Sequence, residues 1–117
     1  LKILNRENKT IWQRKTKINR EVISKKTAQQ LNSMLINVVN SGTGKYAALS
    51  DRDVAGKSGT SEGGRDLLFI GSIPQLTTGV WLGNDENKPT SLSSGDAALL
   101  WKKYMNSIKS KYPIRKF

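Results

Sequence analysis

The sequence predicts an α+β fold in which covering helices pack on an antiparallel sheet. Two observations support this class. Apolar residues recur at helical spacing over residues 24–41 and again over 95–109. Between these helices, residues 53–84 hold three strand-like runs joined by short connections, which implies antiparallel neighbours. With 117 residues, of which 36% are hydrophobic and 25% charged, the chain is one modest domain or part of one.

The first 15 residues are predicted to form a β-hairpin, because apolar strand residues stand on both sides of the polar turn 5–9. A polar connector, residues 16–22, follows it. The chain opens on Leu1, in a strand-like run, rather than on Met. We therefore expect the chain to begin inside a larger protein.

Residues 24–41 are predicted to form the first helix. Ser24 suits the N-cap position, because its hydroxyl can accept an N–H of the first turn. Gly42 suits the left-handed position that follows a last helical turn. An apolar stripe should face the core, and it consists of Ala28, Leu31, Met34, Leu35, Val38 and Val39.

Three antiparallel strands are predicted at residues 53–61, 66–73 and 76–84. In the third strand, Gly79 and Gly83 share one face, since side chains alternate along a strand. Two glycines on one face predict that a helix or another backbone comes close there.

The final helix is predicted at residues 95–109, where Gly95 and Asp96 open it and an apolar stripe follows. The basic residues beyond it are interpreted as a solvated tail. Trp12, Trp81 and Trp101 are interpreted as core or sheet-packing aromatics rather than as residues that stack on a ligand.

Composition narrows the possible chemistry. The chain has no Cys and no His, which excludes a Cys/His zinc site, a thiol nucleophile and any imidazole-dependent triad within it. The formal net charge of +11 favours anionic partners such as nucleic acid, acidic lipid or cell-wall polymer. A solvated basic surface explains the same charge equally well.

The central run, residues 54–61, offers one cation, several hydroxyls and open backbone N–H groups to an anion. A phosphate-binding loop is the first alternative, but Asp51 stands where that motif requires Gly. A phosphate loop must also lead into a helix N-terminus, whereas the Gly-rich run 59–64 follows here. The Gly-rich segment 41–46 fails as well, because it lacks the first Gly and the hydroxyl after Lys45.

The better match is the Lys-Ser/Thr-Gly triplet of penicillin-recognising serine acyltransferases. Residues 22–44 resemble the helix and Gly-Thr-Gly turn that precede this triplet in class A penicillin-binding proteins. Residues 55–61 resemble their Ala-Gly-Lys-Thr-Gly-Thr-Thr stretch, and residues 65–71 and 74–85 resemble the two strands that follow. The final helix resembles their closing helix. The resemblance covers about residues 1–108 and implies a penicillin-binding transpeptidase fold, which is also the fold of serine β-lactamases.

The resemblance implies a role for each residue of the triplet run. Lys57 would supply positive charge beside the nucleophile and toward the substrate carboxylate. The hydroxyls of Ser58 and Thr60 would hold the terminal carboxylate of a D-alanyl-D-alanine stem peptide or of a β-lactam, and Ser61 would also face the substrate. Gly59 would leave room for the substrate, and the Thr60 N–H would be one of two oxyanion-hole donors. No cofactor or metal is expected.

The family's nucleophile is missing from this chain. No Ser has a Lys three residues later, and there is no Ser-x-Asn run. We therefore interpret the chain as the C-terminal portion of a transpeptidase domain that is inactive alone. It would need a companion segment or chain carrying the nucleophilic Ser. The resemblance places the parent protein, expected to be membrane-anchored, at the extracytoplasmic face of the cell envelope.

Two alternatives remain open. A small basic nucleic-acid-binding module would explain the net charge, but the aromatic residues lie on apolar faces and the Lys residues are scattered, so no nucleic-acid partner is expected. A fragment of a serine β-lactamase would share the triplet, but it fits the flanking strands less well.

Overall fold

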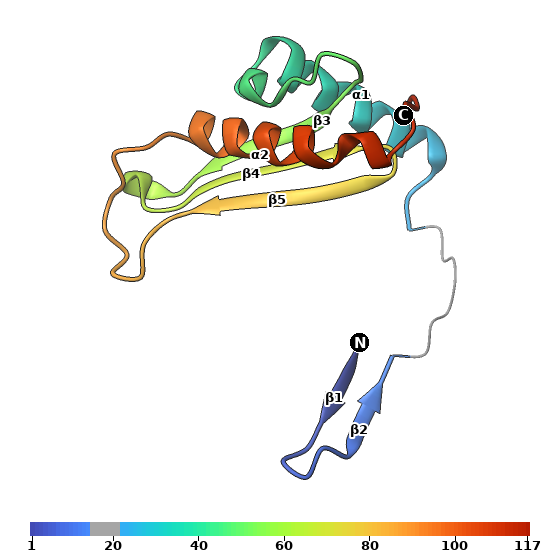
Figure 1. The fold of residues 1–117 in the computed structure, drawn as a ribbon, viewed down its shortest axis with the longest axis vertical. Coiled ribbons are helices and arrows are strands. Elements are labelled where there is room, and N and C mark those ends of the chain that lie inside the picture. Colours follow the sequence, from blue (N-terminus) through green and yellow to red (C-terminus); the bar gives the residue numbers. More distant parts are fainter. Residues whose placement is uncertain (15–21) are drawn as a thin grey trace.

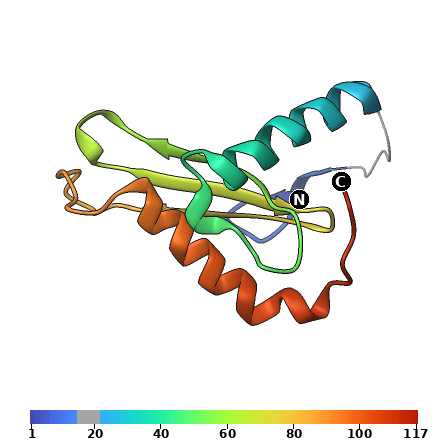
Figure 2. The same ribbon diagram turned by 90° about the horizontal axis from the view of Figure 1, so that it is seen from above.

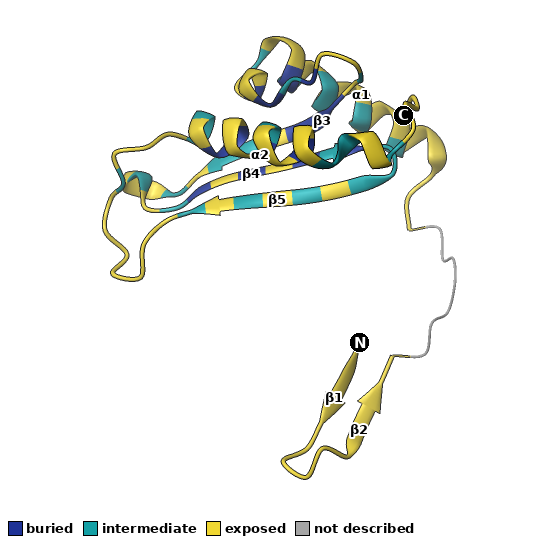
Figure 3. Cartoon of the chain, viewed as in Figure 1, coloured by how far each residue is buried: buried dark blue, intermediate teal, exposed yellow. Residues whose placement is uncertain are grey.

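The computed structural model describes residues 1–14 and 22–117, so most of the polar connector predicted at 16–22 lies outside the described residues. Two separate antiparallel sheets are present among them. The first is the hairpin of β1 (Lys2–Leu4) and β2 (Thr10–Gln13), which pairs Ile3 with Trp12. Every described residue of this hairpin is exposed (Figure 3).

The main sheet has the strand order β3-β4-β5 and is antiparallel throughout. Its strands are β3 (Ala55–Thr60), β4 (Leu67–Ile73) and β5 (Leu76–Leu82). Helix α1 (Lys25–Ser41) packs against β3, while helix α2 (Ser94–Ile108) packs across β4 and β5 (Figure 1). Figure 2 views the strands from above with a helix on either side of them in projection, and Val39 of α1 and Trp101 of α2 both belong to one core with Phe69. The α+β class with an antiparallel sheet is confirmed.

Three short 3₁₀ helices complete the described elements: η1 (Lys45–Ala47), η2 (Glu62–Gly64) and η3 (Lys109–Lys111). None of the described helices is both long and apolar enough to cross a bilayer.

The core lies between α2 and the face of the sheet that carries Phe69. The Trp101 ring meets the Phe69 ring edge-on, with centroids 5.5 Å apart, and its indole N–H donates to the Thr78 carbonyl at 3.2 Å. Trp101 is fully buried, as predicted for it. Trp12 and Trp81 are about half exposed, so neither is a core residue, and both lie on paired strands, which leaves the sheet-packing interpretation for them.

Close approach of a helix to the sheet occurs at Gly71, on β4. A Cβ atom at Gly71 would lie 2.7 Å from the Trp101 ring, so α2 packs directly on this glycine. The prediction of close approach at Gly79 and Gly83 is wrong. A Cβ at Gly79 would meet nothing nearer than an Ile70 side-chain atom at 3.7 Å. The atoms nearest to a Cβ at Gly83 belong to the ring of Trp81, two residues before it, and not to a helix.

Helix α1 begins as predicted and ends differently. Ser24 is its N-cap, and the Ser24 hydroxyl accepts the Thr27 N–H at 3.1 Å. Gly42 is extended, with φ −110°, and does not take the left-handed conformation. Gly42 is needed for space instead, because a Cβ there would lie 2.9 Å from the Val38 carbonyl oxygen. That oxygen accepts the N–H groups of both Gly42 and Gly44, which closes the helix.

The predicted apolar stripe of α1 is only partly buried. Val39 is fully buried, whereas Leu31 and Met34 are exposed. No described helix or strand therefore covers the part of the stripe that contains Leu31 and Met34.

Candidate active site

Strand β3 is an edge strand, and the direction of its hydrogen bonds follows from one contact. The Ser61 N–H donates to the Asp66 carbonyl at 2.9 Å, across the pair of strands. In an antiparallel pair, successive residues alternate between facing the partner strand and facing away. Residues 57, 59 and 61 therefore direct their N–H groups toward β4. The N–H and C=O groups of Ser58 and Thr60 point to the free edge, which is the orientation that an oxyanion donor requires.

Lys57 is exposed and lies on the sheet face opposite to Phe69. Its Nζ donates to the Ser58 carbonyl at 2.8 Å, so the ammonium bends over the free edge. None of the ion pairs found within residues 1–14 and 22–117 involves Lys57. The positive charge therefore lies beside the outward N–H groups, in position to meet an anion.

Ser58 is tied to a residue that the sequence reasoning did not assign to the site. The Ser58 hydroxyl donates to the Thr43 hydroxyl at 2.9 Å. Thr43 lies in the tight turn after α1, where Gly44 packs against Phe69 and Val39. The Gly-Thr-Gly run at residues 42–44 is the sequence signal that could have assigned Thr43 to the site. For Ser58 to donate to a carboxylate, its O–H must turn away from Thr43.

Gly59 and Ser61 differ in their contacts with the neighbouring part of the chain. A Cβ at Gly59 would make only ordinary contact with Leu68, at 3.4 Å, so the fold does not require a glycine here for lack of space. The Ser61 hydroxyl accepts the Asp66 N–H at 2.8 Å. Ser61 thus closes the connection between β3 and β4 with its hydroxyl as well as its backbone.

The loop between β5 and α2 braces this connection. The Thr90 N–H donates to the Gly64 carbonyl at 3.0 Å, and the Arg65 guanidinium donates to the Asn87 carbonyl. The Trp81 indole N–H donates to the Asp66 carboxylate at 3.0 Å. Gly63 and Gly64 turn the chain with φ of 70° and 66°, in the left-handed region that glycine tolerates.

The site is an open edge and not an enclosed pocket. Three hollows in the described part of the chain have volumes of about 360, 230 and 510 Å³, and none of the three is lined by residues 57–61. No group of three or more acidic residues that could hold a metal ion occurs within the described ranges. The arrangement supplies a cation, hydroxyls and outward N–H groups along one strand, which suits an extended anionic peptide.

Comparisons with known proteins show which family the chain resembles. The family model described as the penicillin-binding protein transpeptidase domain matches residues 1–96. Penicillin-binding protein 1A of Clostridium acetobutylicum is 40% identical over 87 residues, which are 74% of this chain and 11% of that protein. Penicillin-binding protein 4 of Bacillus subtilis is 33% identical over 115 residues, which are 98% of this chain and 16% of that protein. The chain thus spans a small part of these relatives.

Solved structures share the fold. The D,D-transpeptidase domain of a peptidoglycan glycosyltransferase from Eggerthella lenta aligns with a TM-score of 0.62 at 24% identity, covering 95% of this chain and 27% of that one. A putative peptidoglycan glycosyltransferase from Atopobium parvulum aligns with a TM-score of 0.66 at 24% identity, covering 83% of this chain and 26% of that one. Sequence match, motif order and fold therefore agree, and the chain belongs to the penicillin-binding protein transpeptidase domain family.

Proposed function

We propose that this chain forms one wall of the acyl-transfer site of a peptidoglycan D,D-transpeptidase. The observation that carries the proposal is the free edge of β3, where the Thr60 N–H points outward beside the Lys57 ammonium. A stem peptide ending in D-alanyl-D-alanine would lie along this edge. Its backbone would pair with the Ser58 and Thr60 groups, as a strand added to a sheet.

Each side chain has a distinct task in this proposal. Lys57 attracts the terminal carboxylate and holds positive charge near the reacting hydroxyl. The hydroxyls of Ser58 and Thr60 bind that carboxylate. The Thr60 N–H stabilises the oxyanion that forms when a Ser attacks the carbonyl carbon of the scissile peptide bond.

The attacking Ser belongs to a companion segment in this proposal, because this chain has no Ser-x-x-Lys run. The Ser oxygen bonds to the carbonyl carbon, the terminal D-alanine leaves as an amine that takes up a proton, and an acyl-enzyme remains. An amine of a second stem peptide then attacks the acyl-enzyme and releases the Ser. A β-lactam would be attacked at its amide in the same way. We place the parent at the extracytoplasmic face of the cell envelope, anchored in the membrane.

A labelled penicillin tests the proposal. The 117-residue chain should not be acylated alone, and the complete transpeptidase domain should be acylated at a Ser outside this chain. The substitution Lys57→Met should slow acylation by about 100-fold or more, the scale at which single groups that stabilise developing charge act. Lys88→Met is the matched control, since the Lys88 ammonium is exposed and forms an ion pair with the exposed Glu86. Acylation of the chain alone, or equal rates in the two variants, would refute the assignment.

A further inference from the structure

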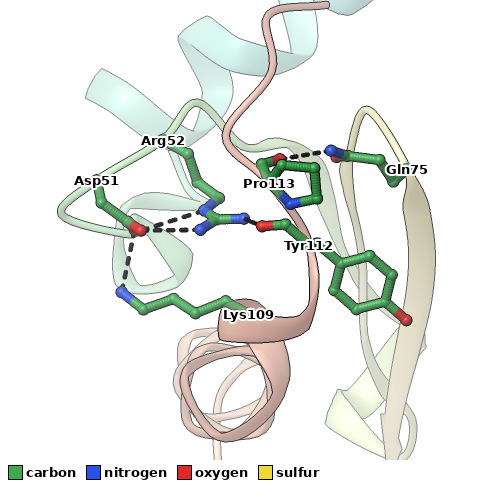
Figure 4. Close-up of polar contacts among 6 residues, drawn as sticks. All are labelled: Asp51, Arg52, Gln75, Lys109, Tyr112 and Pro113. Atoms are coloured by element: carbon green, nitrogen blue, oxygen red, sulfur yellow. Dashed lines mark hydrogen bonds and ion pairs between the residues drawn. The ribbon is translucent and has the colours of Figure 1, made fainter.

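Six residues tie the C-terminal segment to the end of the sheet at which β3 begins. They are Asp51, Arg52, Gln75, Lys109, Tyr112 and Pro113, here called the C-terminal latch (Figure 4). The latch joins three parts of the chain: the loop before β3, the turn between β4 and β5, and the segment after α2.

Arg52 is the centre of the latch. Its Nη1 donates to the Tyr112 carbonyl at 2.9 Å, while its Nε and Nη2 donate to one oxygen of Asp51 at 3.3 and 3.0 Å. The Lys109 ammonium binds the other Asp51 oxygen at 3.0 Å. The Arg52 side chain is only 5% exposed. Because a buried guanidinium that loses its partners carries a large desolvation cost, these contacts hold Arg52 in one place.

A second contact holds the adjacent carbonyl. The Gln75 side-chain amide donates to the Pro113 carbonyl, from the turn between β4 and β5. Two successive carbonyls of the C-terminal segment are thus bound from two sides, by Arg52 and by Gln75. Figure 4 shows the segment passing between these two side chains.

The latch lies immediately before the candidate site in the sequence. Only Asp53 and the buried Val54 separate Arg52 from the first residue of β3. Among the described strands, β3 has a partner on one side only, so its position depends in part on how its ends are held. Its far end is joined to β4 by the Ser61–Asp66 contacts, and Arg52 joins the chain just before its near end to the C-terminal segment.

From this arrangement we infer that the C-terminal latch is a positioning device for β3. It holds the start of the strand so that Lys57 and the Thr60 N–H keep their places at the free edge. Arg52 is thus a positioning residue that acts through β3, and residues 112–113 contribute to the acyl-transfer site without touching substrate. This inference rests on the proposed function for its catalytic consequence, but the structural part stands independently.

Amide hydrogen exchange in the 117-residue chain tests the structural part. Arg52→Met should speed exchange of the β4-facing N–H groups of residues 55, 57 and 59 by about 10-fold or more, while exchange in β4 and α2 changes less. A chain that ends at Lys111 should show the same pattern, whereas one that ends at Ile114, which keeps both bound carbonyls, should match the full chain. Arg115→Met is the control, because it removes an exposed guanidinium from the same region. An equal rise in all elements, or none at residues 55, 57 and 59, would overturn the inference.

Acylation by labelled penicillin in the complete transpeptidase domain tests the catalytic part. A positioning role predicts that Arg52→Met lowers the acylation rate constant of the reactive molecules about 10- to 100-fold, since a small misplacement of reacting groups has effects of this size. Arg52→Lys should restore part of the rate. If only the reactive fraction falls while the rate constant stays at the native value, Arg52 stabilises the fold and does not position the strand. If the native domain is not acylated, the proposed function fails. Hydrogen exchange alone then tests whether the C-terminal latch positions β3.

Discussion

At the scale of single residues, Asp51 is the described acid whose pKa is shifted most by its surroundings. The hydrogen bond from Arg52, then that from Lys109, lowers the pKa of Asp51 from 3.8 to about 2. An acid whose pKa is lower in the folded chain stabilises the fold above its unfolded pKa, and this stabilisation is lost as the pH falls toward the folded pKa. The latch should therefore be intact at pH 5 and weaken between about pH 4 and pH 2.

This behaviour gives a prediction about acid stability. Asp51→Asn should lower the free energy of unfolding by about 1 kcal/mol at neutral pH, a value reduced for a carboxylate that solvent partly screens. The variant should also lose less stability than the native chain between pH 4 and pH 2. Urea unfolding at several pH values measures both effects, and Asp85→Asn, in an exposed loop, is the control. An identical pH dependence in Asp51→Asn and native chains would contradict the prediction.

The structural roles of single residues differ in how well the sequence predicts them. The Ser24 cap and the strand at residues 57–60 could be predicted because their signals are local: a cap before a helix, and a motif in a strand. The Arg52 contact could not, because its partner, Tyr112, lies 60 residues away and contributes a backbone carbonyl, which carries no residue signature. Thr43 stands between these cases, since its turn was visible but its hydrogen bond to Ser58 was not.

At the scale of elements, the packing of α2 on β4 determines which glycines of the sheet can be replaced by a larger residue. Periodicity predicted both elements, but it could not tell which glycine the helix would meet. Gly71 lies under Trp101, and Gly79, on the neighbouring strand, lies on the opposite, exposed face. The two glycines are therefore a matched pair in the same sheet.

Gly71→Ala should lower the free energy of unfolding by about 1–3 kcal/mol, because the new methyl group overpacks against the Trp101 and Phe69 rings. Gly79→Ala should change it by no more than about 0.5 kcal/mol, because its methyl group would make only ordinary contact with Ile70. Denaturant unfolding of the two variants side by side provides the measurement. Equal losses would mean that α2 does not press on β4 as the structure shows.

At the scale of the whole molecule, the sheet is covered on one face and largely open on the other. Phe69 is fully buried, whereas its neighbour Ile70 is 55% exposed beside Lys57. Leu68 and Trp81 are exposed on the same open face. The sequence predicted the alternation but not which face is covered, because that depends on the helices that pack against the sheet. An antiparallel sheet that faces water usually carries polar residues on that side.

Adjacent substitutions on β4 should separate the two faces. Phe69→Ala should cost about 3–5 kcal/mol of folding free energy, as for large core aromatics. Ile70→Thr should cost less than about 1 kcal/mol, because that side chain is not packed. It should also reduce self-association of the isolated chain, which sedimentation would detect. A large stability loss in Ile70→Thr would show that the open face is in fact covered.

The outward groups of β3 have one more consequence. A strand edge that offers N–H and C=O groups to a peptide offers them equally to another β3, so recognition and self-templated aggregation share the same chemistry. Two features of β3 limit such aggregation. The strand has only six residues, and the Lys57 ammonium bends over its edge, where a like-charged copy would be repelled. The same lysine that draws an anionic peptide to the edge thus keeps identical strands apart.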